Sequence, residues 1–377
     1  MKSIFLFVLL FVSFLVTAAQ EPELVYLYGA KLAGDSQAQG RAAGSIDAAN
    51  GFPVAGLLRS VEPQKKVLLF TRGKRPVTLY FFPGTGDRKA LVIGGMHGSE
   101  SSSIEVAETL VKQLSGGGKP FYNVVVIPSL FPDNAETALR DKKGRLKEST
   151  GRHSSPNAAD PNRQMPSPGE PFRAAKPFDR HNRKMEAENQ ALLRLIQEYR
   201  PHRVISIHSI RDRTKAGVFA DPRTDCEGMA LGFDPDRELA LLLAKHIVDS
   251  GGACPGNRLE SAPTALYYSD PPPAPVGKKQ VRSYQRSGVD KKAHGVTLGT
   301  WCSTAVCSSE PAYERPAIRT LTLEFPGYKK VGEYSTAAER ENAYRMMQAY
   351  ASSIRQCFLQ AFLVEENSLA GNTVPVK

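Results

Sequence analysis

The feature that most constrains the fold of this chain is a strand, a helix and a second strand in close succession. Residues 89–93 form a short apolar run, which is typical of a strand buried on both faces. Apolar residues then recur at helical spacing from 104 to 114, and another apolar run occupies 124–128. This succession predicts a βαβ unit and therefore a parallel sheet.

The same alternation continues along the chain and predicts one large α/β domain over residues 65–366. We expect a three-layer sandwich, with a mixed, mostly parallel central sheet flanked by helices. Two long polar connections, 134–183 and 255–315, are placed to line a cleft. The further predicted strands are 67–70 and 77–82, as a hairpin, then 204–207 and 321–325, and the further predicted helices are 186–199, 237–250 and 336–364.

The N-terminus has the pattern of a secretory signal peptide. An apolar run from Ile4 to Val16 follows Met-Lys and is succeeded by Thr17, Ala18 and Ala19. We therefore expect residues 1–19 to be removed and the mature protein to be exported, periplasmic or secreted, without a membrane span. Residues 20–64 are predicted to be a mostly irregular lead-in, and 367–377 a flexible tail.

The formal net charge is +11, but the basic residues are scattered along the chain. A nucleic-acid partner is therefore a weak inference, because no basic stripe with interleaved aromatic residues occurs. Such a charge would attract the protein to anionic surfaces such as cell walls or acidic peptides, or would serve solubility alone.

The chain has five cysteines, an odd number in a compartment that permits disulfides. Order along the sequence suggests that Cys302 pairs with Cys307 and Cys226 with Cys254, which leaves Cys357 unpaired. Four cysteines allow three connectivities, and unpaired buried thiols are an alternative.

Candidate metal ligands follow two of the predicted strands. His97 and Glu100, three residues apart at the start of a predicted helix, can point toward one cation. A catalytic zinc site usually has three protein ligands, and His208, at the end of strand 204–207, is the candidate for the third. If the two strands are parallel neighbours, all three side chains lie beyond the carboxyl edge of one sheet. The other histidines are assigned no role.

Glu324 is the candidate general base. It interrupts the apolar strand 321–325, where a carboxylate is costly unless it faces a polar cavity or a cation. An ion pair with Arg319 would be the structural explanation. Beside a zinc site, however, a base is needed to take the proton of an activated water molecule.

Four motifs in this order resemble the zinc carboxypeptidase family, which includes pancreatic carboxypeptidases and bacterial murein peptide amidases. The resemblance extends from about residue 78 to residue 328, and Gly299-Thr300-Trp301 is similar to a stretch of the murein peptide amidases. The motifs are His97-Gly98-Ser99-Glu100, Asp160-Pro161-Asn162-Arg163-Gln164, Ser206-Ile207-His208-Ser209 and Leu321-Thr322-Leu323-Glu324-Phe325.

The resemblance implies one zinc ion per chain on His97, Glu100 and His208, with Glu324 as general base. It also implies that Asn162 and Arg163 bind the free carboxylate of the substrate, a task suited to a guanidinium fork. The family has a further arginine that polarises the scissile carbonyl. Arg152 is our choice for that role, with Arg140 and Arg145 as competitors.

Together these features predict a hydrolase of the metallocarboxypeptidase type that cleaves an amide bond near a free carboxylate. We expect peptidoglycan stem peptides as the substrate, with the C termini of proteins or peptides as the runner-up. A zinc deacylase of N-acyl amino acids and a binding protein without catalytic activity are the alternatives from other classes. Loss of Glu324 or of a ligand would mark the binding protein, and neither is lost.

Overall fold

The computed structural model describes residues 54–117, 119–140, 150–266, 271–282 and 294–327, with scattered residues between 336 and 364. The predicted signal peptide, the tail, Cys357 and most of the predicted helix 336–364 lie outside these residues. One short helix, α2 (Val54–Leu57), lies within the lead-in that was expected to be mostly irregular, and it buries Val54 and Leu57.

A seven-stranded mixed sheet forms the centre of the fold, in the order β1-β2-β4-β3-β5-β7-β6. The four central strands β4, β3, β5 and β7 are parallel to one another, whereas β1, β2 and β6 pair antiparallel. The strands are β1 (Gln64–Phe70), β2 (Pro76–Phe82), β3 (Lys89–Ile93), β4 (Asn123–Ile127), β5 (Arg203–Ile210), β6 (Gly217–Ala220) and β7 (Arg319–Pro326). The mixed sheet confirms the predicted fold class.

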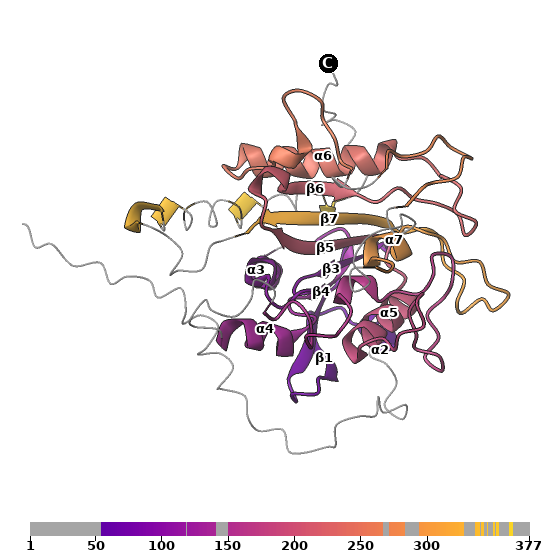
Figure 1. The fold of residues 1–377 in the computed structure, drawn as a ribbon. Helices are drawn as coiled ribbons and strands as arrows, with labels where there is room; N and C mark the ends of the chain where they lie inside the picture. Colours follow the sequence, from indigo (N-terminus) through magenta and orange to yellow (C-terminus); the bar gives the residue numbers. More distant parts are fainter. Residues whose placement is uncertain are drawn as a thin grey trace, which may run out of the picture. The chain divides into compact units, whose positions relative to one another are not determined.

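Helices cover both faces of the sheet, because alternate residues of each buried strand point to opposite sides. Val92 packs in a cluster with residues of α3 and α6, whereas Leu91 and Ile93 pack in a second cluster with residues of α5 and α7. Figure 1 shows α3 on one side of the central strands and α5 and α7 on the other. The remaining helices are α3 (Ser101–Gly116), α4 (Pro132–Arg140), α5 (Ala187–Tyr199), α6 (Asp234–Asp249) and α7 (Leu298–Cys302), with 3-10 turns η1 (Pro161–Arg163), η2 (Arg213–Lys215) and η3 (Pro255–Asn257).

The sequence predicted every strand of the sheet except β6. This strand has only four residues, Gly-Val-Phe-Ala, too few for a periodic signal. It pairs with β7, so that Gly217 lies opposite Glu324. Among the described residues, no helix combines the length and apolar character needed to cross a membrane.

The predicted disulfides are wrong. Cys226 is bonded to Cys307, while Cys254 and Cys302 are buried free thiols. The reason is spatial proximity, because Thr224 and Thr304 form a bridge between two loops that are far apart in the sequence. This contact brings Cys226 and Cys307 together, whereas Cys302 belongs to α7 and packs inside. A disulfide is consistent with export.

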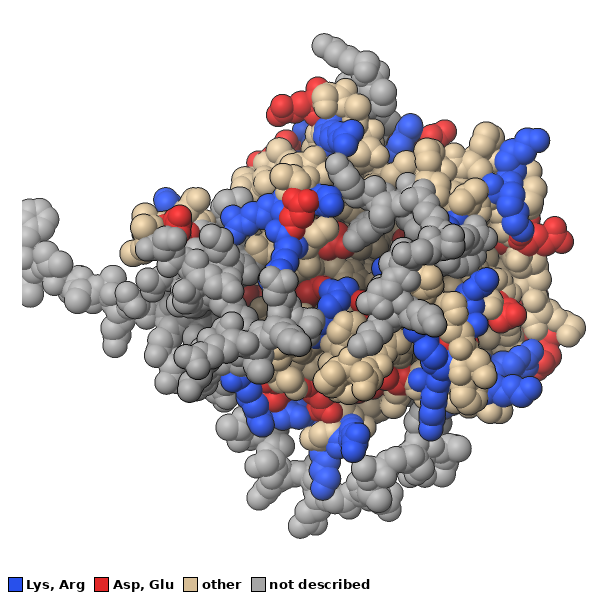
Figure 2. All heavy atoms as spheres, in the orientation of Figure 1, with Lys and Arg blue, Asp and Glu red and all other residues tan. Residues whose placement is uncertain are grey.

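Charged side chains are mixed on the visible surface. On the face shown in Figure 2, lysines and arginines are interspersed with aspartates and glutamates. The described residues visible in this view therefore form no basic stripe of the kind that follows a nucleic-acid backbone.

Candidate metal centre and carboxylate-binding loop

His97 and Glu100 meet in the turn that joins β3 to α3. The Glu100 amide donates to the His97 carbonyl at 3.0 Å, so the backbone reverses and both side chains point the same way. His97 Nδ1 lies 2.8 Å from Glu100 Oε1. Gly98 lets α4 pack closely against this turn, since a Cβ there would lie only 2.1 Å from the Ala135 amide nitrogen of α4. Both side chains are buried.

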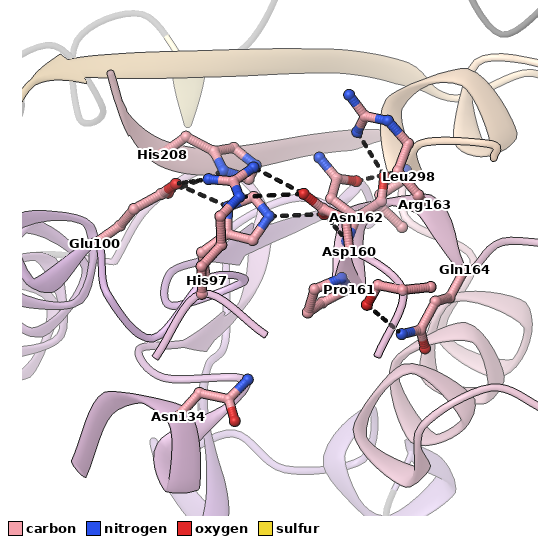
Figure 3. Close-up of polar contacts among 12 residues, drawn as sticks. His97, Glu100, Asn134, Asp160, Pro161, Asn162, Arg163, Gln164, His208 and Leu298 are labelled. Atoms are coloured by element: carbon pink, nitrogen blue, oxygen red, sulfur yellow. Dashed lines mark hydrogen bonds and ion pairs between the residues drawn. The ribbon is translucent and has the colours of Figure 1, made fainter. Parts of the chain in front are cut away.

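His208 joins them from the end of β5, which is the parallel neighbour of β3. Its Nδ1 lies 3.1 Å from Glu100 Oε2, and the same oxygen accepts a 3.1 Å hydrogen bond from the Ser209 amide. Ser206, on the same face of β5, contacts His208 Nε2 at 3.0 Å. The expected convergence of His97, Glu100 and His208 is therefore present, and their side chains point toward one another in Figure 3.

These three residues fit a divalent transition metal. They offer two imidazole nitrogens and a carboxylate oxygen, all within 4.8 Å of one another and all buried. Two histidines and a glutamate are one of the donor sets that three-ligand catalytic zinc sites use. The partners of the two Nε2 atoms fix the ring orientations and leave both Nδ1 atoms directed at the shared point. The group can thus hold a metal ion.

Asp160 is a site residue whose role sequence reasoning missed. Its Oδ1 lies 2.9 Å from His97 Nε2, and its Oδ2 accepts from Arg152 Nη2 at 2.8 Å. Asp160 also begins η1, where its side chain accepts from the Asn162 amide at 2.8 Å. An aspartate two residues before the Asn-Arg pair was visible in the motif. Its partner His97, however, lies 63 residues away along the chain.

The carboxylates dominate the electrostatics of this cluster. Burial alone would lower the pKa of His97, but the charges of Glu100 and Asp160 raise it to about 9. Burial alone would raise the pKa of Glu100 and of Asp160. His97 and His208 hold the pKa of Glu100 well below its usual range, and His97, Arg152 and Arg163 do the same for Asp160. The cluster therefore favours a positive charge at the point where the three side chains meet.

Glu324 lies beside these residues on β7. It is directly opposite His208 in the register of the parallel pair β5–β7, and registered residues of parallel strands point to the same face. The residue is buried. Burial lowers the pKa of Arg152, but the charges of Asp160 and Glu100 raise it above its ordinary value, and the charge of Glu324 adds a smaller rise. Glu324 is thus within electrostatic reach of the cluster.

Asn162 and Arg163 follow Asp160 on the loop that faces the metal ligands (Figure 3). The side-chain oxygen of Asn162 accepts from the Leu298 amide of α7 at 2.9 Å, which leaves its Nδ2 donor for a ligand. Arg163 is half-buried, and its Nη1 donates to the Asn162 carbonyl at 2.8 Å. The pair therefore offers hydrogen-bond donors on the same side as the metal cluster.

Of the three competing arginines, Arg152 lies at the cluster. It donates to Asp160 through Nε and Nη2 and to Glu100 Oε1 through Nη1 at 3.1 Å. Arg140 instead pairs with Glu136 on α4, with 73% of its side chain exposed. Arg145 lies outside the described residues.

No protein-family model matches the chain, and no curated protein matches it in sequence. Solved structures do resemble it. A proposed metallopeptidase from Shewanella amazonensis has 17% identity and a TM-score of 0.43 over 81% of this chain and 88% of that chain. Murein-tripeptide amidase MpaA from Escherichia coli O157 has 18% identity and a TM-score of 0.39 over 80% and 95%. A metallo-carboxypeptidase from Burkholderia cenocepacia has 16% identity and a TM-score of 0.40 over 80% and 66%. At these values, function must be argued from the residues of the chain itself.

Proposed function

We propose that the chain is an exported zinc-dependent hydrolase of the carboxypeptidase type, with one zinc ion on His97, Glu100 and His208. It cleaves an amide bond near a free carboxylate, and peptidoglycan stem peptides are the proposed substrate. The observation that carries the proposal is the register of β5 and β7. This register sets Glu324 directly opposite His208, while His208 and His97 both contact Glu100.

Zinc at this site would supply Lewis-acid polarisation of the scissile carbonyl and would make the attacking water more acidic. Glu324 takes the proton of that water on its carboxylate and passes it to the leaving amine. A carboxylate in a buried strand is suited to this task because it is held in place and shielded from bulk solvent.

Arg152 and the Asn162–Arg163 pair position the substrate. Asp160 holds the Arg152 guanidinium through two donors, and this side chain remains 36% exposed, so it can also donate to the scissile carbonyl oxygen. The Arg163 fork and Asn162 Nδ2 bind the terminal carboxylate. Binding one end of the substrate in this way places its amide bond near Glu324.

The choice of stem peptides rests on three features of the sequence. The N-terminus has the pattern of an exported protein, and the net charge of +11 would favour an anionic cell wall. In addition, Gly299-Thr300-Trp301 is similar to the murein peptide amidases. These residues form α7, whose Leu298 amide holds Asn162.

The direct test is digestion of purified muropeptides, with product masses read by mass spectrometry. We expect cleavage next to a residue with a free carboxylate, and a stoichiometry near one zinc per chain by elemental analysis. Turnover of ordinary peptide C termini alone would indicate a carboxypeptidase that acts on proteins or peptides instead of stem peptides. Turnover of N-acetyl amino acids alone would indicate a deacylase. No hydrolysis by zinc-loaded protein would contradict the proposal.

A further inference from the structure

An ion pair between a buried aspartate, Asp179, and a partly exposed arginine, Arg183, supports the Asn162–Arg163 loop. Asp179 is almost completely buried, with 1% of its side chain exposed, and its Oδ2 accepts from Arg183 Nε at 2.6 Å. Its Oδ1 accepts from the amides of His181 and Arg183 at 2.8 and 2.9 Å. Asp179 thus closes a tight turn around Arg183 and fixes the plane of the guanidinium.

The free end of that guanidinium reaches two other segments. Arg183 Nη2 donates to the carbonyl of Arg163 at 2.9 Å and to the carbonyl of His294 at 2.9 Å. The approach is close, because a Cβ on Gly295 would lie 2.0 Å from the Arg163 carbonyl oxygen and 2.9 Å from Arg183 Nη2. Gly295 also has a φ of +147°, which other residues rarely adopt.

The two segments joined by Arg183 are the ones that orient the proposed carboxylate receptor. Arg183 holds Arg163 by its carbonyl. The second segment runs from His294 to Leu298, whose amide donates to the side-chain oxygen of Asn162. The Met165 amide also donates to the Val296 carbonyl at 3.3 Å, so the two segments run side by side. A shift of either segment would therefore move Arg163 relative to Asn162.

We propose that Arg183, oriented by Asp179, is a positioning residue for recognition of the substrate carboxylate. This inference rests on the function proposed above. Arg183 sets Arg163 and Asn162 at the separation that lets both meet one carboxylate. Its own charge is neutralised by Asp179, so it acts through the loop and not as a second receptor.

The experiment compares a peptide with a free terminal carboxylate and the same peptide amidated at that end, for zinc-loaded wild type, Arg183→Ala and Arg183→Lys. The quantity compared is the ratio of kcat/KM for the free peptide to kcat/KM for the amidated one. We expect wild type to prefer the free peptide and this ratio to fall about three- to tenfold in Arg183→Ala, mainly through a higher KM for the free peptide. Turnover of the amidated peptide and the zinc content should stay near wild type. Arg183→Lys should recover part of the loss, because an ammonium can still donate to one carbonyl.

Arg223→Ala is the matched control. Arg223 also pairs through Nε with a buried aspartate, Asp236, at 2.7 Å, and 24% of its side chain is exposed, against 29% for Arg183. Its loss should lower the melting temperature less, because Asp236 also accepts from Arg319 Nε at 2.6 Å, and should leave the preference for the free peptide unchanged.

The outcomes separate the two proposals. If wild type itself does not distinguish free from amidated peptide, the assignment of Arg163 is wrong and the role of Arg183 is wrong with it. If wild type does distinguish them and Arg183→Ala does so equally well while melting earlier, Arg183 only stabilises the fold. Should Arg183→Ala not fold, Asp179→Asn replaces it in the same comparison of free and amidated peptide, because this variant keeps the volume and one acceptor oxygen but loses the charge that orients Arg183. A preference equal to that of wild type would again contradict the proposal.

Discussion

The metal-ligand side of the site and the Asn162–Arg163 side are held in place by different kinds of structure. His208 and Glu324 are registered residues of two paired parallel strands, and His97 follows the next strand of the same sheet. Asn162 and Arg163 lie on a 3-10 turn of three residues, outside the strands of the sheet. This turn is held by individual hydrogen bonds. Leu298 donates to the Asn162 side chain, Arg183 to the Arg163 carbonyl and Asn189 to the Pro161 carbonyl, and the Asn162 amide donates to Asp160.

The difference implies unequal tolerance to change. Strand register is fixed by many ladder hydrogen bonds and by the buried faces of the sheet, so a ligand can be replaced without moving its neighbours. A loop held by individual side chains shifts when one of them is lost. We therefore expect substitutions on the metal side to change chemistry at constant geometry, and substitutions on the loop side to change recognition through geometry.

Replacing a metal ligand should give the largest effect. His208→Ala leaves two of the three protein ligands, and we expect loss of zinc and of nearly all hydrolysis, with a sheet that still folds. Elemental analysis and circular dichroism check the two parts. Leu323→Ala is not a suitable control because it opens the core. Ser206→Ala removes only the contact that orients His208, so it should weaken metal binding without abolishing it. An unchanged zinc content in His208→Ala would contradict the assignment of His208 as a metal ligand.

Glu324→Gln should keep both the metal and the geometry and still lose most turnover. The amide has nearly the volume of the carboxylate but cannot accept the proton of water, and general acid–base catalysis contributes on the order of 100-fold or more. The measurement is kcat of zinc-loaded protein on its best substrate, beside zinc content and melting temperature. A rate near that of wild type would place the base elsewhere.

Arg163→Ala tests the loop side and should be milder. A charge-assisted hydrogen bond contributes about 1.5 to 3 kcal/mol, so we expect a loss of roughly tenfold to a hundredfold in kcat/KM for a substrate with a free carboxylate. Amidating that carboxylate should cost wild type a similar factor, and the two losses should not add. Arg163→Lys should recover only part of the rate, since it loses the bidentate fork. A variant that still distinguishes free from amidated substrate would make Arg152 the receptor.

The same contrast explains what the sequence could predict. A histidine and a glutamate that end or interrupt apolar strands, His208 and Glu324, are visible because a polar residue in a buried strand needs a partner. Parallel strands then bring their carboxyl ends to one edge. The sheet and the meeting of His97, Glu100 and His208 follow from this reasoning, and the structure has both.

The loop side gave much weaker signals. Asn162 and Arg163 were singled out by resemblance alone, since a polar pair in a long loop has no period to mark it. Arg183 acts on main-chain carbonyls, which every residue has, so no sequence pattern marks its partners. The wrong disulfides have the same origin, because the pairing of Cys226 with Cys307 depends on two loops that meet only in the folded protein.

The smallest expected effect concerns the helix behind the loop and should leave chemistry unchanged. Glu188 lies in the first turn of α5, next to Asn189, and burial together with Glu186 and Asp133 raises its pKa to about 7. Because the native pKa lies above the unfolded value, ionisation costs stability as the pH rises from about 4.5 to 7, and the cost is complete above that. Glu188→Gln should therefore melt later than wild type at pH 8 and no later at pH 4. The gain in the free energy of unfolding is at most about 3 kcal/mol and smaller in so far as water reaches the side chain.

The control is Glu198→Gln at the other end of α5, where an exposed ion pair with Arg194 contributes little at either pH. If Glu188→Gln also changes the preference for a free carboxylate, the support of the loop extends into α5, and the boundary between the two sides of the site must be drawn further from Asn162 and Arg163.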